Sequence, residues 1–196
     1  MRHALLSLSF SFAALLNGGA HAGEPQTAVF AGGCFWCVEA DFDKLDGVLA
    51  TTSGFAGGSV EDPSYKQVTR GGTGHLEVVE ITYDPDIVSF RTLADYLLRH
   101  VDPTDDGGQF CDRGDSYRTA IFYSSETEKS DAEAALSSAS DALGQKVVTR
   151  AIKLDAFYPA EEYHQDYYKK SPLQYAYYRR SCGRDRRVEA VWSAAS

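Results

Sequence analysis

Two cysteines three residues apart form the part of this sequence best suited to chemistry. Cys34 and Cys37 stand in the segment GCFWC, shortly after a β-branched and aromatic run at 27–30. The pattern predicts a strand, a tight turn at the glycines and a helix that begins near Cys34. The positive end of a helix dipole stabilises a thiolate, so we expect a lowered pKa for Cys34. A partner at i+3 lies on the same helix face, within reach of a disulfide, and the pair therefore favours redox chemistry on sulfur.

The same C-x-x-C spacing also fits half of a zinc site or a structural disulfide. Zinc would need a second pair of soft ligands. Cys111, Cys182 and the five histidines show no second C-x-x-C and no H-x3–5-H spacing. The ligand pattern therefore favours a redox pair, and we expect no metal.

The composition favours one globular domain with no affinity for nucleic acid. The chain has 196 residues, 43% of them hydrophobic, enough for one sizeable core, and we expect a single catalytic domain over residues 23–196. The formal net charge of −9 excludes the basic surface that nucleic-acid binding requires. The local run RDRR at 184–187 is interpreted as a solvated face.

The N-terminus has the pattern of a secretory signal. Arg2 precedes an apolar run at 4–16, and the A-x-A sequence that ends at Ala22 predicts cleavage after that residue. The alternative is a retained membrane anchor, for which the run is short. We expect a signal peptide over 1–22, export to the bacterial periplasm and no stable membrane span after cleavage. Four cysteines in an exported chain favour disulfide chemistry.

Hydrophobic periodicity predicts an α+β fold. Strands are expected over 75–83, 117–123 and 146–154, and helices over 89–100 and 126–143. Ser125 and Glu128 form a capping box at the start of the second helix. The aromatic-rich tail after residue 161 is expected to wrap the core in short helical pieces. No regular βαβ rhythm is present, which favours a compact α+β sandwich.

Four motifs occur in order along the chain: GCFW at 33–36, TGHLE at 73–77, DRGDSYR at 112–118 and YHQDY at 163–167. With them the sequence, over roughly residues 26–193, resembles the A-type peptide-methionine sulfoxide reductases. The resemblance implies a two-layer, ferredoxin-like α+β sandwich with helices packed on a mixed sheet, and no bound cofactor. It implies reduction of the S epimer of methionine sulfoxide in oxidised proteins or peptides, with a thioredoxin-like dithiol as reductant.

Sulfoxide reduction needs a nucleophile and an acid. The sulfur of a sulfoxide is electrophilic only when its oxygen is protonated or strongly hydrogen-bonded, and Cys34 would attack it as thiolate. A buried carboxylic acid with a raised pKa could supply the proton. Strand alternation alone leaves Glu77 equally open to being an exposed carboxylate, but Glu77 matches the family's acid.

The resemblance assigns the remaining pocket residues. Tyr65 and Tyr117 match phenols that hydrogen-bond the sulfoxide oxygen, and Asp112 matches an aspartate that organises the site. Phe35 and Trp36 would hold the S-methyl group, because contact between sulfur and aromatic rings is favourable.

Oxygen transfer leaves a sulfenic acid on Cys34, which condenses with a nearby thiol to form a disulfide. Helix spacing favours Cys37 as that resolving thiol. Many relatives have glycine there and use a C-terminal cysteine, so Cys182 stays the alternative, as resolving thiol or as a relay. If Cys37 resolves, Cys111 and Cys182 remain as a candidate structural disulfide.

Two other functions compete with this prediction. A thioredoxin-type thiol–disulfide oxidoreductase would also use C-x-x-C, but it leaves the TGHLE and DRGDSYR motifs unexplained. A secreted, disulfide-stapled binding module would have all four cysteines permanently bridged.

Overall fold

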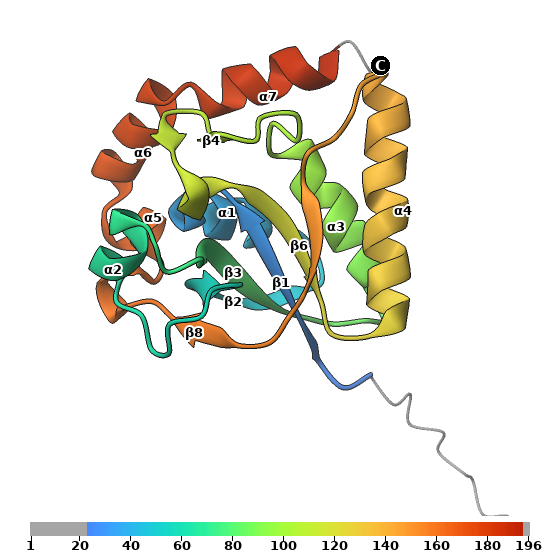
Figure 1. The fold of residues 1–196 in the computed structure, drawn as a ribbon, viewed down its shortest axis with the longest axis horizontal. Coiled ribbons are helices and arrows are strands. Elements are labelled where there is room, and N and C mark those ends of the chain that lie inside the picture. Colours follow the sequence, from blue (N-terminus) through green and yellow to red (C-terminus); the bar gives the residue numbers. More distant parts are fainter. Residues whose placement is uncertain (1–22, 194–196) are drawn as a thin grey trace, which may run out of the picture.

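The computed structural model describes residues 23–193, so the predicted signal segment at 1–22 lies outside the described residues (Figure 1). None of the helices in this range has the length and hydrophobicity needed to cross a membrane. The elements follow in the order β1 (Gln26–Gly32), α1 (Phe35–Phe42), β2 (Val48–Ala56), α2 (Tyr65–Arg70), β3 (Leu76–Tyr83), α3 (Phe90–Arg99), β4 (Gly108–Gln109), β5 (Asp112–Arg113), the 3₁₀ helix η1 (Asp115–Tyr117), β6 (Thr119–Tyr123), α4 (Glu126–Leu143), β7 (Arg150–Lys153), β8 (Phe157–Pro159), the 3₁₀ helix η2 (Glu162–His164), α5 (Tyr167–Lys170), α6 (Pro172–Ser181) and α7 (Arg184–Trp192).

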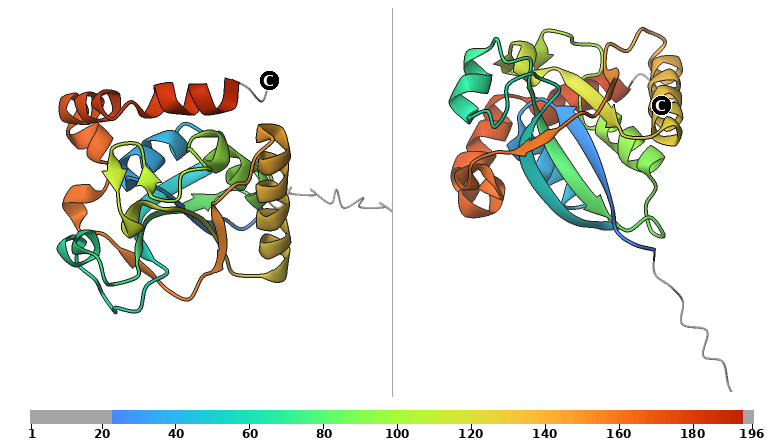
Figure 2. Two further views of the ribbon diagram at one scale, coloured as in Figure 1. Left: turned by 45° about the horizontal axis from the view of Figure 1, so that its top comes forward. Right: turned by 60° about the horizontal axis from the view of Figure 1, so that its bottom comes forward.

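The main sheet has six strands in the order β7-β6-β1-β3-β2-β8 and is strongly curled. It is mixed, because β7 runs parallel to β6 while the other pairs are antiparallel. The edge strands β7 and β8 are joined only by residues 154–156. In a flat sheet they would lie about 24 Å apart, five strand spacings, whereas the four Cα–Cα steps between them reach at most about 15 Å. The two edges must therefore curve toward each other, as Figure 2 shows.

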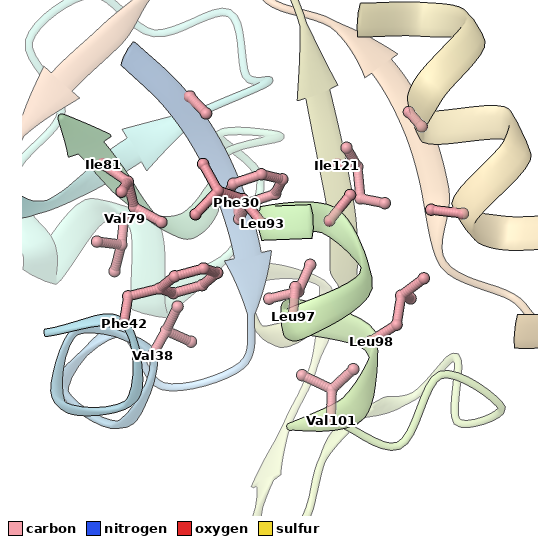
Figure 3. Close-up of a cluster of buried hydrophobic side chains, with 14 of the residues drawn as sticks. Phe30, Val38, Phe42, Val79, Ile81, Leu93, Leu97, Leu98, Val101 and Ile121 are labelled. Atoms are coloured by element: carbon pink, nitrogen blue, oxygen red, sulfur yellow. The ribbon is translucent and has the colours of Figure 1, made fainter. Parts of the chain in front are cut away.

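The larger core lies between one face of the sheet and helices α1 and α3 (Figure 3). Phe30 on β1 is fully buried and stacks on Phe42 of α1, with ring centroids 5.5 Å apart. Leu93 and Leu97 follow the helical repeat of α3 and point into the same cluster. A smaller cluster, with Phe122 as its largest fully buried member, lies on the opposite face of the sheet. Both faces of β1 are thus covered, which explains its continuous run of buried residues.

These features confirm the predicted α+β fold with helices on a mixed sheet. The helix expected at 126–143 is α4, and the side chain of its N-cap Ser125 accepts a hydrogen bond from the Glu128 amide, as the capping box predicts. The strand expected at 117–123 begins only at Thr119, because Asp115–Tyr117 forms η1. The strand expected at 146–154 is limited to Arg150–Lys153, where it pairs with β6.

Strand β2 was not predicted, because its segment is rich in glycine. Gly54 lies inside the strand where β8 passes close by: a Cβ there would be 2.5 Å from the Tyr158 carbonyl oxygen. A glycine inside a strand can mark a place where another backbone approaches closely, and it need not mark a turn. Helix α2 was also missed, although Ser64 and Gln67 form a capping box at its start.

The C-terminal helix α7 contributes Val191 and Trp192 to the core. It also carries a buried arginine, so the interpretation of the RDRR run as a solvated face was wrong for that residue. Arg184 is only 1% exposed, and its guanidinium donates to the carbonyls of Gly32, at 3.1 Å, and His100, at 3.0 Å. The other three residues of the run are exposed. Arg184 is therefore an interior side chain that ties α7 to the end of β1, while the predicted solvated face holds only for the rest.

Candidate active site

A tight turn places Cys34 between β1 and α1. Gly33 has a φ of +83°, and a Cβ at this position would lie 2.6 Å from the Cβ of Gln109, so the turn requires glycine. Cys34 is the N-cap of α1, and its carbonyl accepts hydrogen bonds from the amides of Cys37 and Val38. The predicted strand, turn and helix around the nucleophile are therefore confirmed.

Cys34 opens onto a pocket of about 70 Å³, room for a group of only a few heavy atoms. The lining residues come from six different elements and their flanking turns, and they are Cys34, Phe35, Trp36, Tyr65, Glu77, Asp112, Tyr117 and Tyr178. The structure thus brings together every pocket residue that the resemblance assigned. Tyr178 was missed, because the tail carries several tyrosines and no local pattern separates this one from the others.

Glu77 is the acid of the pocket and is not an exposed strand carboxylate. It lies on β3, is 1% exposed, and its Oε2 accepts the Phe35 amide at 3.1 Å. Burial raises the pKa of Glu77 to about 8, although the Phe35 amide opposes the shift and Asp112 adds to it. At neutral pH the carboxyl therefore carries a proton that it can donate.

Two phenols stand beside this acid. Burial first, and then the Glu77 carboxyl, raise the pKa of Tyr65 to about 12 and that of Tyr117 even further above its ordinary value. Tyr117 is hydrogen-bonded to both Tyr65 and Glu77. Both phenols therefore stay protonated and present O–H donors on the Glu77 side of the pocket.

The aromatic wall of the pocket is fixed from behind by the YHQDY segment. The indole N–H of Trp36 donates to Nδ1 of His164 at 3.1 Å, and the Trp36 ring stacks on Tyr167 with centroids 3.9 Å apart. Phe35 packs against the His164 ring at 5.0 Å. Burial lowers the pKa of His164, which suits a neutral acceptor, so this histidine packs against the aromatic wall and accepts a hydrogen bond.

Asp112 is held by Tyr178, whose hydroxyl donates to its Oδ2. Burial raises the pKa of Asp112, while the Tyr178 hydrogen bond and the Arg184 charge act in the opposite direction. Tyr178 also lines the pocket beside Cys34, and its hydroxyl lowers the pKa of that thiol. Asp112 therefore reaches the nucleophile through one intervening phenol.

The two thiols of the GCFWC segment are buried together, which changes the expected electrostatics. Burial first, and then Cys37, raise the pKa of Cys34, so the expectation of a lowered pKa at the helix N-terminus was wrong. Desolvation of a fully buried thiolate outweighs the helix dipole, which contributes about 1 kcal/mol. A hydrogen bond from Cys34 lowers the pKa of Cys37 to about 7, and the charges of Arg184 and Arg179 act in the same direction. Burial opposes this shift. In the resting pair the proton stays on Cys34, and the Cys34 thiol directs it toward the Cys37 sulfur.

The other two cysteines form a disulfide. Cys111 and Cys182 are bonded across a sequence separation of 71 residues, with Cα atoms 5.0 Å apart, while Cys34 and Cys37 are free. The predicted pairing is therefore present in the structure. It joins the turn before β5 to the end of α6, beside the pocket rather than in it.

Comparisons with known proteins agree with this geometry. The family model of peptide methionine sulfoxide reductase matches residues 26–196. The peptide methionine sulfoxide reductase MsrA 2 of Rhizobium meliloti is 51% identical over 173 residues, which cover 88% of this chain and 86% of the relative. The MsrA/MsrB protein of Vibrio cholerae is 48% identical, and the match covers 86% of this chain and 45% of that longer protein.

Solved structures give the same result. Reduced Mxr1 from Saccharomyces cerevisiae matches with a TM-score of 0.72 and 31% identity, over 76% of this chain and 86% of its own. Methionine sulfoxide reductase A of Corynebacterium diphtheriae matches with a TM-score of 0.69 and 31% identity, over 81% and 79% of the two chains. Mxr1 in complex with Trx2 matches at 0.53 and 25% identity, over 73% and 84%. From its sequence, its fold and its pocket, this chain belongs to the peptide methionine sulfoxide reductase family.

Proposed function

We propose that this protein reduces methionine-S-sulfoxide, free or within oxidised proteins and peptides, to methionine. The observation that carries the proposal is the convergence of a thiol, a protonated carboxylic acid and two phenols on one small pocket. Cys34 supplies the nucleophile and Glu77 the proton. The thioredoxin-type alternative needs only the two thiols and gives no role to a buried, protonated glutamate.

The first step transfers oxygen from substrate to enzyme. Tyr65 and Tyr117 hydrogen-bond the sulfoxide oxygen, while Phe35 and the partly buried Trp36 contact the S-methyl group. The Cys34 proton passes to the Cys37 sulfur as Cys34 attacks the substrate sulfur. Glu77 protonates the oxygen, so that thiolate, sulfoxide and proton yield methionine and a sulfenic acid on Cys34.

The second step forms a disulfide, for which we assign Cys37 as the resolving thiol. Cys37 is hydrogen-bonded to Cys34 and now carries the proton taken from it. Its sulfur displaces hydroxide from the sulfenic acid, water leaves, and a Cys34–Cys37 disulfide remains. Cys182, the alternative, is occupied by its bond to Cys111.

A dithiol must then reduce the Cys34–Cys37 disulfide. The structure of Mxr1 in complex with Trx2 supports a thioredoxin-like protein as that reductant. Exchange proceeds through a mixed disulfide and returns both thiols of the enzyme while the partner is oxidised. No bound cofactor takes part in this cycle.

We further propose that residues 1–22 form a signal peptide, cleaved after Ala22, and that residues 23–196 act as one catalytic domain in the bacterial periplasm. The support is the basic, apolar and A-x-A order of the N-terminus. A disulfide beside the active site also suits an oxidising compartment. N-terminal sequencing of protein from the periplasmic fraction tests this: mature protein that begins with Met1, or protein absent from that fraction, would contradict it.

One assay separates the candidate functions. Purified enzyme is given dabsylated methionine-S-sulfoxide with dithiothreitol, and separately insulin with the same reductant. We expect turnover of the sulfoxide and no acceleration of insulin reduction. Cys34→Ser should abolish sulfoxide turnover even with excess dithiothreitol, because no other group in the pocket can attack sulfur. Insulin reduction without sulfoxide turnover would favour the thioredoxin-type function.

A further inference from the structure

Tyr178 is the pocket residue contributed by the C-terminal helices, and three contacts fix its side chain. The hydroxyl donates to Asp112 Oδ2, and it lines the same pocket as the Cys34 thiol, whose pKa it lowers against the effect of burial. The ring lies edge-on to the Trp36 indole, with centroids 5.8 Å apart and planes at 80°. The phenol thus lies between the nucleophile, the carboxylate and the aromatic wall.

The fold holds the backbones of Tyr178 and Asp112 close together. Tyr178 lies in the last turn of α6, where its carbonyl accepts the Cys182 amide at 3.0 Å. Cys182 is bonded to Cys111, the residue directly before Asp112. Figures 1 and 2 show α6 and α7 closing over the end of the sheet where β4 and β5 lie. The backbones that carry the phenol and the carboxylate are therefore joined covalently within a few residues of each.

We propose that Tyr178 is a further catalytic residue, whose hydroxyl orients the Cys34 sulfur and stabilises its thiolate during attack on the substrate. In the resting enzyme Cys34 keeps its proton, and the phenol directs its own proton to Asp112. When the Cys34 proton moves to Cys37, the sulfur becomes the stronger acceptor and the phenol donates to it. This role rests on the proposed sulfoxide reduction.

The phenol must act against groups that the substitution leaves in place. The other titratable groups around the Cys34 sulfur are Cys37, Tyr65, Glu77, Asp112 and Tyr117, while the charges of Arg184 and Arg179 act on the neighbouring Cys37. Phenylalanine keeps the ring and its packing on Trp36, and it removes only the hydroxyl. Tyr178→Phe therefore removes the hydroxyl's hydrogen bond to Asp112 together with its interaction with the Cys34 sulfur, and the double-mutant cycle below separates the two.

The first measurement needs no turnover. In a Cys37→Ser background Cys34 is the only free thiol of the chain, because Cys111 and Cys182 are bonded to each other. The rate of alkylation by iodoacetamide is followed against pH with and without Tyr178→Phe. We expect the midpoint to move to higher pH in the variant, since the thiolate loses a donor. An unchanged midpoint would overturn the proposal, whether or not the enzyme reduces sulfoxides.

The second measurement is single-turnover methionine release from pre-reduced enzyme that retains Cys37. Tyr178→Phe should lose roughly 10- to 100-fold in rate, the range for a hydrogen bond to a charged group, with little change in substrate affinity. Tyr177→Phe is the matched control, because this neighbouring tyrosine is 76% exposed, and it should match the parent. Equal rates in the parent and Tyr178→Phe, with wild-type melting temperatures, would refute the role.

A double-mutant cycle guards against a purely structural effect. Asp112→Asn and Tyr178→Phe are combined, and single-turnover rates are compared with those of each variant alone. Since Asp112 reaches Cys34 through the phenol, the combined loss should be smaller than the product of the separate losses. Fully multiplicative losses would show that Tyr178 does not link Asp112 to the nucleophile.

Discussion

Glu77→Gln should slow oxygen transfer by about 10²–10⁴-fold at neutral pH, the usual contribution of a general acid. The glutamine keeps the shape and can still accept the Phe35 amide. With a pKa of about 8, Glu77 is protonated in about nine-tenths of molecules at pH 7. An ordinary exposed glutamate, with a pKa near 4.3, would be protonated in fewer than about one in a hundred. The substitution thus removes a proton that the burial of Glu77 keeps available.

The pH profile distinguishes this role from simple damage to the pocket. An acid must be protonated to act, so the rate should fall as the pH rises through the pKa of Glu77. Between pH 7 and 9 the protonated fraction of Glu77 drops from about nine-tenths to about one-tenth, while the thiolate fraction of Cys37, whose pKa is about 7, rises from about half to nearly all. The wild-type rate should therefore fall about fivefold. Glu77→Gln has no such proton to lose. Its residual rate should stay level or rise with pH as more Cys34 becomes thiolate.

The assay is single-turnover release of methionine from pre-reduced enzyme, which separates oxygen transfer from reduction of the disulfide. Glu80→Gln is the matched control: it lies on the same strand, is only half-buried, and should stay within about twofold of wild type on the scale of surface changes. A Glu77→Gln variant with more than a tenth of the wild-type rate at pH 7 would refute the reasoning. So would an alkaline fall identical in the two enzymes.

Two further predictions concern the disulfide and the shape of the pocket. Replacing both Cys111 and Cys182 with alanine should lower the free energy of unfolding by about 4 kcal/mol on the chain-entropy estimate for a 71-residue separation. Denaturant unfolding measures this loss; turnover with a thioredoxin-like reductant should survive, and its collapse in Cys182→Ser alone would indicate a relay. If Phe35 and Trp36 hold the S-methyl group while Glu77 and the two phenols hold the oxygen, only one epimer fits, and racemic sulfoxide should stop near half conversion. Complete consumption, measured by chiral chromatography, would contradict that arrangement.

The sequence identified those parts of the fold and of the site that depend on local pattern. The capping residue Ser125 located the start of α4, and the glycine turn before Cys34 located the nucleophile. Motif order alone linked Glu77, 43 residues further along the chain, to that nucleophile. Strand alternation left its burial undecided, because burial depends on the helix that packs over the strand.

Three features could not be predicted, each for a tertiary reason. The pKa of Cys34 follows from its burial, which outweighs the dipole of the helix it begins. Arg184 is charged and surrounded by charged residues in sequence, yet its partners are carbonyls of segments 84 and 152 positions away. Tyr178 enters the pocket only because α6 folds back across the Asp112 segment.

Burial of both active-site sulfurs decides which oxidants can reach them. Cys34 is 5% exposed and Cys37 2% exposed, and Cys34 keeps its proton until a substrate arrives. Peroxides attack accessible thiolates, and over-oxidation to sulfinic or sulfonic acid is irreversible for most enzymes. Cys34 is both protonated and covered while the enzyme is idle, whereas Cys37, with a pKa of about 7, is protected by its burial alone. Met1 is moreover the chain's only methionine, so the sequence after it offers no methionine to the damage that the enzyme repairs. We therefore expect the resting enzyme to resist the oxidants that create its substrate.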